Sequence, residues 1–296
     1  MHEFLHTVAH LLWHTALDTA KILPFLFLAY LLMEFLEHKA GGAAERWLRG
    51  SGKVGPLLGG ALGVLPQCGF SAAATGFYGA RIITAGTLIA VYLSTSDEML
   101  PILISEGAPL PLILKLLGTK MLIGVVAGFC VDGVSYLLRK RRPTDTEVQI
   151  EELCERENCD CGNRFVLSAL KHTLYITVFL FLFTLVMNAV IEGIGEENLQ
   201  AIVLNRPVLG SVLSALVGLI PNCASSVIIT SLYLDGVLSS GAMLSGLLVN
   251  AGIGLAILFR NNRPIKDSFR IVLILWGIAV FSGILIDLTP VGAWLY

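Results

Sequence analysis

Charged residues are scarce in this sequence. Asp, Glu, Lys and Arg make up 14% of the 296 residues, and hydrophobic residues make up 55%. An average soluble domain carries about 25% charged residues, so this chain lacks the polar surface that a soluble core of its size needs. The net charge of −2 gives no reason to expect a nucleic-acid partner. The composition predicts an integral membrane protein.

Enzyme motifs and a disulfide framework are also missing. The sequence has no Ser-His-Asp constellation, no HExxH motif and no phosphate-binding glycine loop, so we expect no enzyme and no tightly bound cofactor. The six cysteines are too scattered for a disulfide scaffold. The first residues include histidines instead of a basic region, and no small-residue cleavage motif follows the first apolar run. We therefore expect no cleavable signal peptide.

Long apolar runs divide the chain into two halves. Runs such as 22–36 and 175–191 are apolar all round, as helices that face lipid are, whereas the helices of a soluble bundle are amphipathic. We predict helices at 10–37, 54–65, 69–80, 84–104 and 111–138, and again at 168–192, 207–220, 224–234, 240–259 and 268–289. The second and third runs of each half are shorter than the ~20 residues of a full span. They fit broken or re-entrant helices; the alternative is that they continue past these bounds as tilted spans.

The second half repeats the first in a constant frame. The motif Pro66-Gln67-Cys68 returns 155 positions later as Pro221-Asn222-Cys223. In the same frame, Ser71, Thr75, Tyr78, Gly86, Gly128 and Asp132 return as Ser226, Thr230, Tyr233, Gly241, Gly283 and Asp287. Such a set of identities is hard to ascribe to chance among apolar helices.

Basic residues predict the orientation of the two halves. They cluster at 39–53, at Arg81, at 139–142 and at 260–266, while the alternate loops are acidic or neutral. Under the positive-inside rule, all these clusters are cytoplasmic only if each half crosses an odd number of times. We therefore predict an all-α polytopic membrane protein of two inverted-topology repeats, each of about five helical segments, with both termini outside. Residues 1–138 form the first repeat, 139–167 a cytoplasmic linker and 168–296 the second repeat. Inverted repeats with broken helices are typical of secondary transporters.

The two proline motifs are the strongest candidates for a substrate site. Proline ends the incoming helix, and small polar residues start a new one whose first amides lack partners. Unwound backbone at membrane depth is tolerated where it is buried in protein or lines a watery cavity. In the inverted arrangement the two tips face each other, so we predict a site formed by Gln67, Cys68, Ser71, Asn222, Cys223, Ser225 and Ser226. The alternative is a pair of kinked helices whose small residues serve close packing.

Acidic residues inside an apolar run mark a second candidate. Asp97 and Glu98 follow Ser94-Thr95-Ser96, and an acid at mid-helix costs about 2.5–3.5 kcal/mol on insertion scales. Asp97 could bind a cation or carry a proton; it could also pair with Lys120 or lie near the outer surface. Asn250 occupies the position that matches Thr95, and we include it in the site.

Two further groups contain metal-ligating side chains. His2, His6, His10 and His14 recur every fourth residue, so neighbouring pairs on a helix could share a metal ion; the alternative is an interfacial helix with half-polar rings on its wet face. The linker holds Cys154, Cys159 and Cys161, soft ligands that the cytosol keeps reduced. With no second cysteine pair or histidine in the linker, they do not form a standard closed zinc site, and an ordinary solvated linker is the alternative.

The stretch 65–104, LPQCGFSAAATGFYGARIITAGTLIAVYLSTSDEMLPILI, and its counterpart at 220–244 resemble a known family. It is the family of ten-span heavy-metal exporters, whose members are described as arsenic efflux proteins or manganese transporters. The likeness extends over nearly the whole chain, and the paired proline-cysteine motifs and STSDE are its most specific parts. It implies a metal exporter in the plasma (inner) membrane. It supplies no ligand set, so the site residues rest on the arguments above.

Two substrate classes remain open. In the first, a metal ion is exported by alternating access: Cys68 and Cys223 are soft ligands, and Asp97 offsets cation charge. Two cysteines suit zinc, copper or trivalent arsenic better than manganese. In the second, a small oxyanion such as phosphate or arsenate binds at opposed helix N-termini with Lys120 nearby. The partners expected are membrane lipid and a small inorganic ion, with a homodimer left open.

Overall fold

The computed structural model describes residues 54–64, 68–96, 99–139, 207–262 and 264–295, with isolated positions between 13 and 31 and between 170 and 186. The isolated positions are all helical, in agreement with the helices predicted at 10–37 and 168–192. The candidate residues Gln67, Asp97, His2, His6, His10, His14, Cys154, Cys159 and Cys161 lie outside the described residues.

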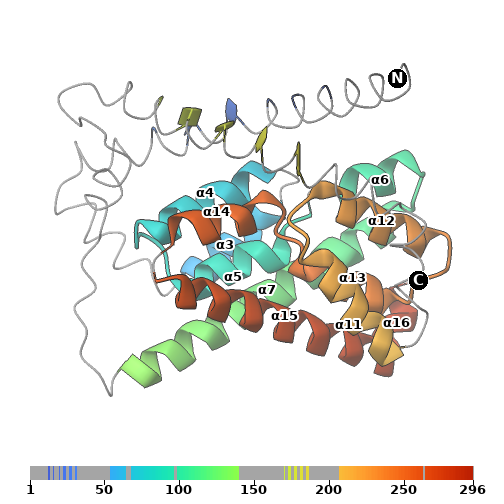
Figure 1. Cartoon of the computed structure of the whole chain (residues 1–296). Helices are drawn as coiled ribbons and strands as arrows, with labels where there is room; N and C mark the ends of the chain where they lie inside the picture. The colour runs from blue at the N-terminus through green and yellow to red at the C-terminus, as the bar shows by residue number, and fades with distance from the viewer. Residues whose placement is uncertain are drawn as a thin grey trace, which may run out of the picture.

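The described part of the first half consists of five helices (Figure 1). They are α3 (Gly55–Gly63), α4 (Cys68–Gly79), α5 (Ala85–Ser94), α6 (Met99–Ser105) and α7 (Leu110–Arg139). Proline in the first turn starts α3, where a missing amide proton has no cost. The Thr84 side chain caps α5 by accepting from the Thr87 amide.

The described part of the second half repeats this order and adds a short last helix. Its helices are α11 (Pro207–Gly218), α12 (Cys223–Leu234), α13 (Ser240–Val249), α14 (Ile253–Asn261), α15 (Ile265–Leu288) and α16 (Pro290–Trp294). Ser239 caps α13 as Thr84 caps α5, by accepting from the amide three residues ahead. All described elements are helical, as predicted from the composition.

The expectation of continuous helices at 84–104 and 240–259 was wrong. The first run unwinds at Thr95, whose ψ is 130°, and the second at Asn250–Gly252, where Gly252 has a left-handed φ of 52°. Local side-chain bonds compete with the helix there: the Thr95 hydroxyl donates to the Val91 carbonyl at 2.7 Å, and the Asn250 side-chain oxygen accepts from the Gly252 amide at 2.9 Å. Each half therefore contains a helix broken in its interior.

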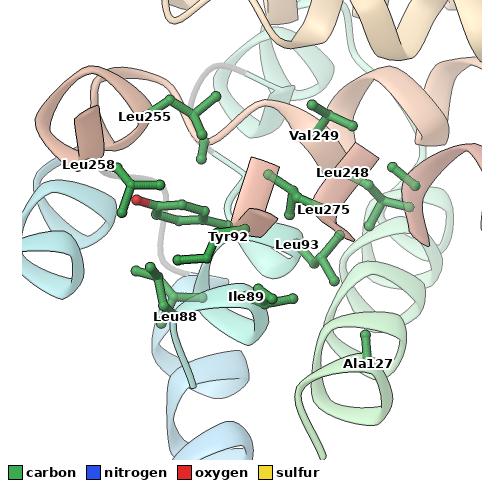
Figure 2. Close-up of a cluster of buried hydrophobic side chains, with 14 of the residues drawn as sticks. Leu88, Ile89, Tyr92, Leu93, Ala127, Leu248, Val249, Leu255, Leu258 and Leu275 are labelled. Carbon is green, nitrogen blue, oxygen red and sulfur yellow. The ribbon is translucent and has the colours of Figure 1, made fainter. Parts of the chain in front are cut away.

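The broken helices form the centre of the molecule. Every residue of α13 and nearly all of α5 are buried, which agrees with their uniformly apolar sequences. Helices α3 and α7 pack on α5, and α11 and α15 pack on α13. Figure 2 shows the core between the halves, where Leu88, Tyr92 and Leu93 of α5 meet Leu248, Leu255 and Leu275 of the second half.

Each half also lends one helix to the other. Helix α14 packs against α4, and α6 packs against α12, so the part after each break lies on the opposite half (Figure 1). The contacts make the two halves one interlocked body.

The same hydrogen bonds join α5 to α7 and α13 to α15. Asp132 accepts from the Thr84 hydroxyl at 2.6 Å and from the Gly86 amide at 2.9 Å. Its counterpart Asp287 accepts from the Ser239 hydroxyl at 2.7 Å and the Gly241 amide at 2.8 Å. Each carboxylate therefore lies at the N-terminus of a helix, where the helix dipole favours a negative charge.

Four helices among the described residues are long and apolar enough to cross a membrane: Ala85–Ser105, Leu110–Leu138, Ser240–Asn261 and Ile265–Leu288. The first and third are the broken helices and are mostly enclosed by protein. The second and fourth, α7 and α15, have largely exposed apolar faces. A lipid-facing shell of long helices around a protein-enclosed pair of broken ones follows from this distribution.

Candidate functional site

A helix starts after each proline motif, close to where the sequence predicts it. Helix α3 ends at Gly63 and α4 starts at Cys68, while α11 ends at Gly218 and α12 starts at Cys223. Both cysteines therefore begin a helix; their side chains lie outside the described part of the structure. Ser71, Asn222, Ser225 and Ser226, which follow or flank them, are all buried.

In the second half, the start of α12 lies against the break between α13 and α14. The Asn250 side-chain amide donates to the Ser225 hydroxyl at 2.8 Å, and that hydroxyl lies 2.8 Å from the Asn222 carbonyl to which it donates. Asn250 and Ser225 were predicted from separate segments to share a site, and the structure brings them into direct contact. One polar cluster therefore links the proline motif to the unwound backbone.

In the first half, the junction between α3 and α4 lies against both breaks. The Ser96 hydroxyl donates to the Val64 carbonyl, which ends α3, at 2.7 Å. Ser71 of α4 lies against Gly254: a Cβ added to Gly254 would lie 3.0 Å from the Cβ of Ser71. The structure thus places Ser71 beside the start of α14, just after the second half's break.

Hydroxyl groups bind the backbone after that second break. The Thr75 hydroxyl donates to the Ser71 carbonyl at 2.6 Å and lies 2.6 Å from the Tyr92 hydroxyl. The Gly254 carbonyl lies 3.1 Å from the Tyr92 hydroxyl and 3.2 Å from that of Thr75. These contacts couple α4 and α5 to the first turn of α14.

Lys120 lies where the two broken helices meet. Its side chain is 1% exposed, and its ammonium donates to the carbonyls of Thr95 and Leu247, the latter at 2.9 Å. Sequence reasoning considered Lys120 as a partner of Asp97 or as an anion ligand, and it missed these backbone acceptors. The presence of a lysine in the middle of an apolar helix could have indicated that its ammonium binds buried acceptors.

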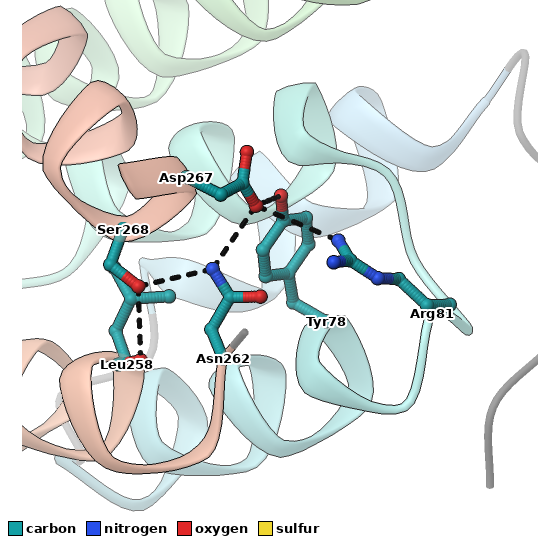
Figure 3. A network of polar contacts seen from close by, with 6 residues as sticks. All are labelled: Tyr78, Arg81, Leu258, Asn262, Asp267 and Ser268. Carbon is teal, nitrogen blue, oxygen red and sulfur yellow. Dashed lines mark hydrogen bonds and ion pairs between the residues drawn. The ribbon is translucent and has the colours of Figure 1, made fainter. Parts of the chain in front are cut away.

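A polar network between the halves at the far end of α4 was also missed (Figure 3). The Tyr78 hydroxyl donates to the Asp267 carboxylate at 2.6 Å, and the Asn262 side chain donates to the same oxygen at 3.0 Å. Arg81 forms an ion pair with Asp267 at 3.6 Å, and its guanidinium lies over the Tyr78 ring. The counterpart Tyr233 donates instead to the Leu295 carbonyl at 3.0 Å. The two tyrosines thus donate to different acceptors, a carboxylate for Tyr78 and a backbone carbonyl for Tyr233.

Among the side chains that the structure describes, the potential ligands near the breaks are oxygen atoms. Among the described side chains, no group of three or more His, Cys, Asp or Glu is close enough to hold a metal ion. The described donors are the hydroxyls of Ser71, Ser225 and Ser226, the amide oxygens of Asn222 and Asn250, and backbone carbonyls. Oxygen donors and helix C-termini suit a cation, and the two cysteines at the helix starts would add soft ligands.

Comparison with known families supports the resemblance noted from the motifs. Residues 141–259 match the model of a family described as "Putative, 10TM heavy-metal exporter". The matched range contains the second proline motif, α11, α12, α13 and most of α14. No curated protein and no solved structure matches the chain. The chain is a multi-pass membrane protein that is similar, over this part, to that family.

Proposed function

We propose that the chain is a secondary exporter of a metal ion that works by alternating access of two inverted halves. Residues 1–138 and 168–296 form the halves, 139–167 a cytoplasmic linker, and both termini lie outside. The distribution of basic residues supports the inversion, since only an odd number of crossings in each half brings every basic cluster to one side. The reciprocal packing of α6 on α12 and α14 on α4 supports a two-fold relation between the halves.

The observation that carries this proposal is the meeting of two interior helix breaks. Thr95 ends α5 and Asn250 ends α13, at matching positions of the repeat, and both breaks lie beside a proline motif. Irregular backbone enclosed by protein at membrane depth is the usual place of a transport site. A structural scaffold alone would gain nothing from two such breaks, because each leaves carbonyls and amides that need partners.

We assign the roles of the site residues from their chemistry. Cys68 and Cys223 are soft ligands, and Gln67, Ser71, Asn222 and Ser226 are oxygen donors. Asn250 and Ser225 hold the second break in shape, and Asp97 offsets the charge of the cation. Thiolates favour zinc, copper or trivalent arsenic over manganese. The residues His2, His6, His10 and His14 and the linker residues Cys154, Cys159 and Cys161 are proposed only as auxiliary metal ligands.

An oxyanion such as phosphate or arsenate is the competing substrate. Helices α4 and α12 both begin at the proline motifs, and helix N-termini bind anions. The Lys120 ammonium, which could act as an anion ligand, already donates to two carbonyls. That engagement favours a cation as substrate, because carbonyl oxygens that accept from an ammonium can also coordinate a cation.

Uptake into everted membrane vesicles tests the proposal. Zinc, copper(I), manganese, arsenite and phosphate are compared for wild type and for Cys68→Ser/Cys223→Ser. We expect uptake of a thiophilic ion and its loss in the double variant. Cys130→Ser is the matched control, because Cys130 is a free, exposed cysteine on α7, away from both breaks. Uptake of anions alone, or full metal uptake by the double variant, would refute the assignment.

A further inference from the structure

Lys120 has no counterpart in the repeat. The position 155 residues later is Leu275, and both side chains are fully enclosed, with 1% and 0% of their surface exposed. Because Leu275 is buried at the equivalent position of α15, an apolar side chain can fill this place in the repeat. Packing alone therefore does not call for an ammonium group at this depth, and burying one is unfavourable unless it is hydrogen-bonded.

Two carbonyl oxygens that accept from Lys120 come from the ends of two different helices. Thr95 is the C-cap of α5, and Leu247 lies in the last turn of α13, which ends at Val249. The last carbonyls of a helix lack amide partners, and the C-terminal end carries the negative end of the helix dipole. One ammonium thus sits on the negative ends of one helix from each half.

This geometry is that of a cation site. Half-helix C-termini and unwound carbonyls are the groups that bind cations inside transporters. We propose that the Thr95 and Leu247 carbonyls form a cation site shared by the halves, which the Lys120 ammonium fills in the empty carrier and the transported cation fills in the loaded one. This inference rests on the proposed transport function and names the groups that exchange during the cycle.

The exchange explains why a lysine is useful at this position. Without a cation, the Thr95 and Leu247 carbonyls would lose this donor inside the protein, and their desolvation would oppose a conformational change of the empty carrier. A tethered ammonium on a flexible four-carbon stem satisfies them and withdraws when cargo arrives. Lys120 is therefore a positioning residue that permits the return of the empty carrier.

Two transport modes measured on one protein test this inference. Proteoliposomes are loaded with the metal that wild type carries, and net efflux is compared with exchange of external isotope for internal metal. For Lys120→Met, which keeps the length of the side chain without its charge, we expect exchange within about threefold of wild type and net efflux reduced by about tenfold or more. Lys115→Met is the control, because Lys115 is a partly exposed lysine on the same helix that donates to the Trp294 carbonyl; both modes should stay at the wild-type level.

The outcomes separate this inference from the proposed function. A wild-type protein that carries no metal refutes the proposed function itself. If wild type transports and Lys120→Met keeps full net efflux, the ammonium is not needed for the return step, and the inference is overturned. Loss of both modes in monodisperse Lys120→Met and Lys120→Gln also overturns it, because a residue needed only to hold the fold would affect exchange and net efflux alike. Lys120→Arg, which keeps the charge, should retain more net efflux than either neutral variant.

Discussion

The contact between α5 and α7 gives the sharpest prediction for stability. Gly86 touches Gly128 so closely that a Cβ on Gly86 would lie 2.2 Å from the Gly128 carbonyl oxygen and 2.4 Å from the Asp132 carboxyl carbon. Both distances are more than an ångström shorter than ordinary contacts. Because the carbonyl belongs to a helix backbone, it cannot rotate aside, and Gly86→Ala must push the two helices apart.

The expected size of the effect follows from three contributions. Overpacking costs about 1–3 kcal/mol. Weakening the bond from the Gly86 amide to the Asp132 carboxylate adds up to about 1.5–3 kcal/mol, while replacing glycine in a helix returns at most about 1 kcal/mol. We expect a net loss of about 2–5 kcal/mol, which corresponds to a fall in melting temperature on the order of 10 °C.

Thermal unfolding in detergent, followed by intrinsic fluorescence at one scan rate, measures this effect. The fixed scan rate matters because such unfolding is often kinetically controlled. Gly241→Ala repeats the perturbation in the second half, where the Cβ would lie 2.1 Å from the Gly283 carbonyl oxygen, and should cause a similar fall. Gly118→Ala on α7 is the control, since nothing lies within 4 Å of its added Cβ. If Gly86→Ala has the same melting temperature as wild type, α5 and α7 do not pack as closely as the Gly86–Gly128 contact requires.

Three further results are expected. Asp132→Asn and Asp287→Asn should each lower stability by about 1–3 kcal/mol, and by similar amounts, because each removes the charge from an equivalent pair of hydrogen bonds; chemical denaturation of the two variants checks this. Asn250→Ala should lower the melting temperature and impair transport, since it removes the partner of the Gly252 amide, whereas an exposed-site variant should do neither. Tyr78→Phe should cost about 1–2 kcal/mol by removing the bond to Asp267, and melting curves in detergent measure the loss.

The helices themselves were largely predictable from the sequence. The predicted bounds 54–65, 69–80 and 111–138 correspond to α3, α4 and α7 within a few residues, because apolar runs and proline positions set them. The breaks inside 84–104 and 240–259 were not predicted. Hydropathy does not distinguish an apolar helix from two shorter ones, and the decisive features are local: side-chain bonds at Thr95 and Asn250 and the left-handed Gly252.

The candidate site was predicted in part. Asn250 was included because it matches Thr95 in the repeat frame, and Ser225 because it belongs to the second proline motif; the structure places the two in contact. The contact of Ser71 with Gly254 and the carbonyls bound by Lys120 depend on how α14 crosses to the first half, which no local pattern encodes. The coordination roles of Cys68, Cys223, Gln67 and Asp97 stay predictions.

The exchange of helices between the halves has a consequence for how the protein is made. Thr75 and its partner Gly254 are separated by 179 positions. At about 5–20 residues per second, a ribosome completes Gly254 roughly 10–40 s after Thr75. During that time α14 has not been synthesised, so the Thr75 hydroxyl of α4 lacks the Gly254 carbonyl as an acceptor. Synthesis of this chain therefore includes an interval in which the first half has been made but cannot complete its packing. We expect the yield of folded protein to depend on whether the first half stays free of aggregation until α14 has been synthesised.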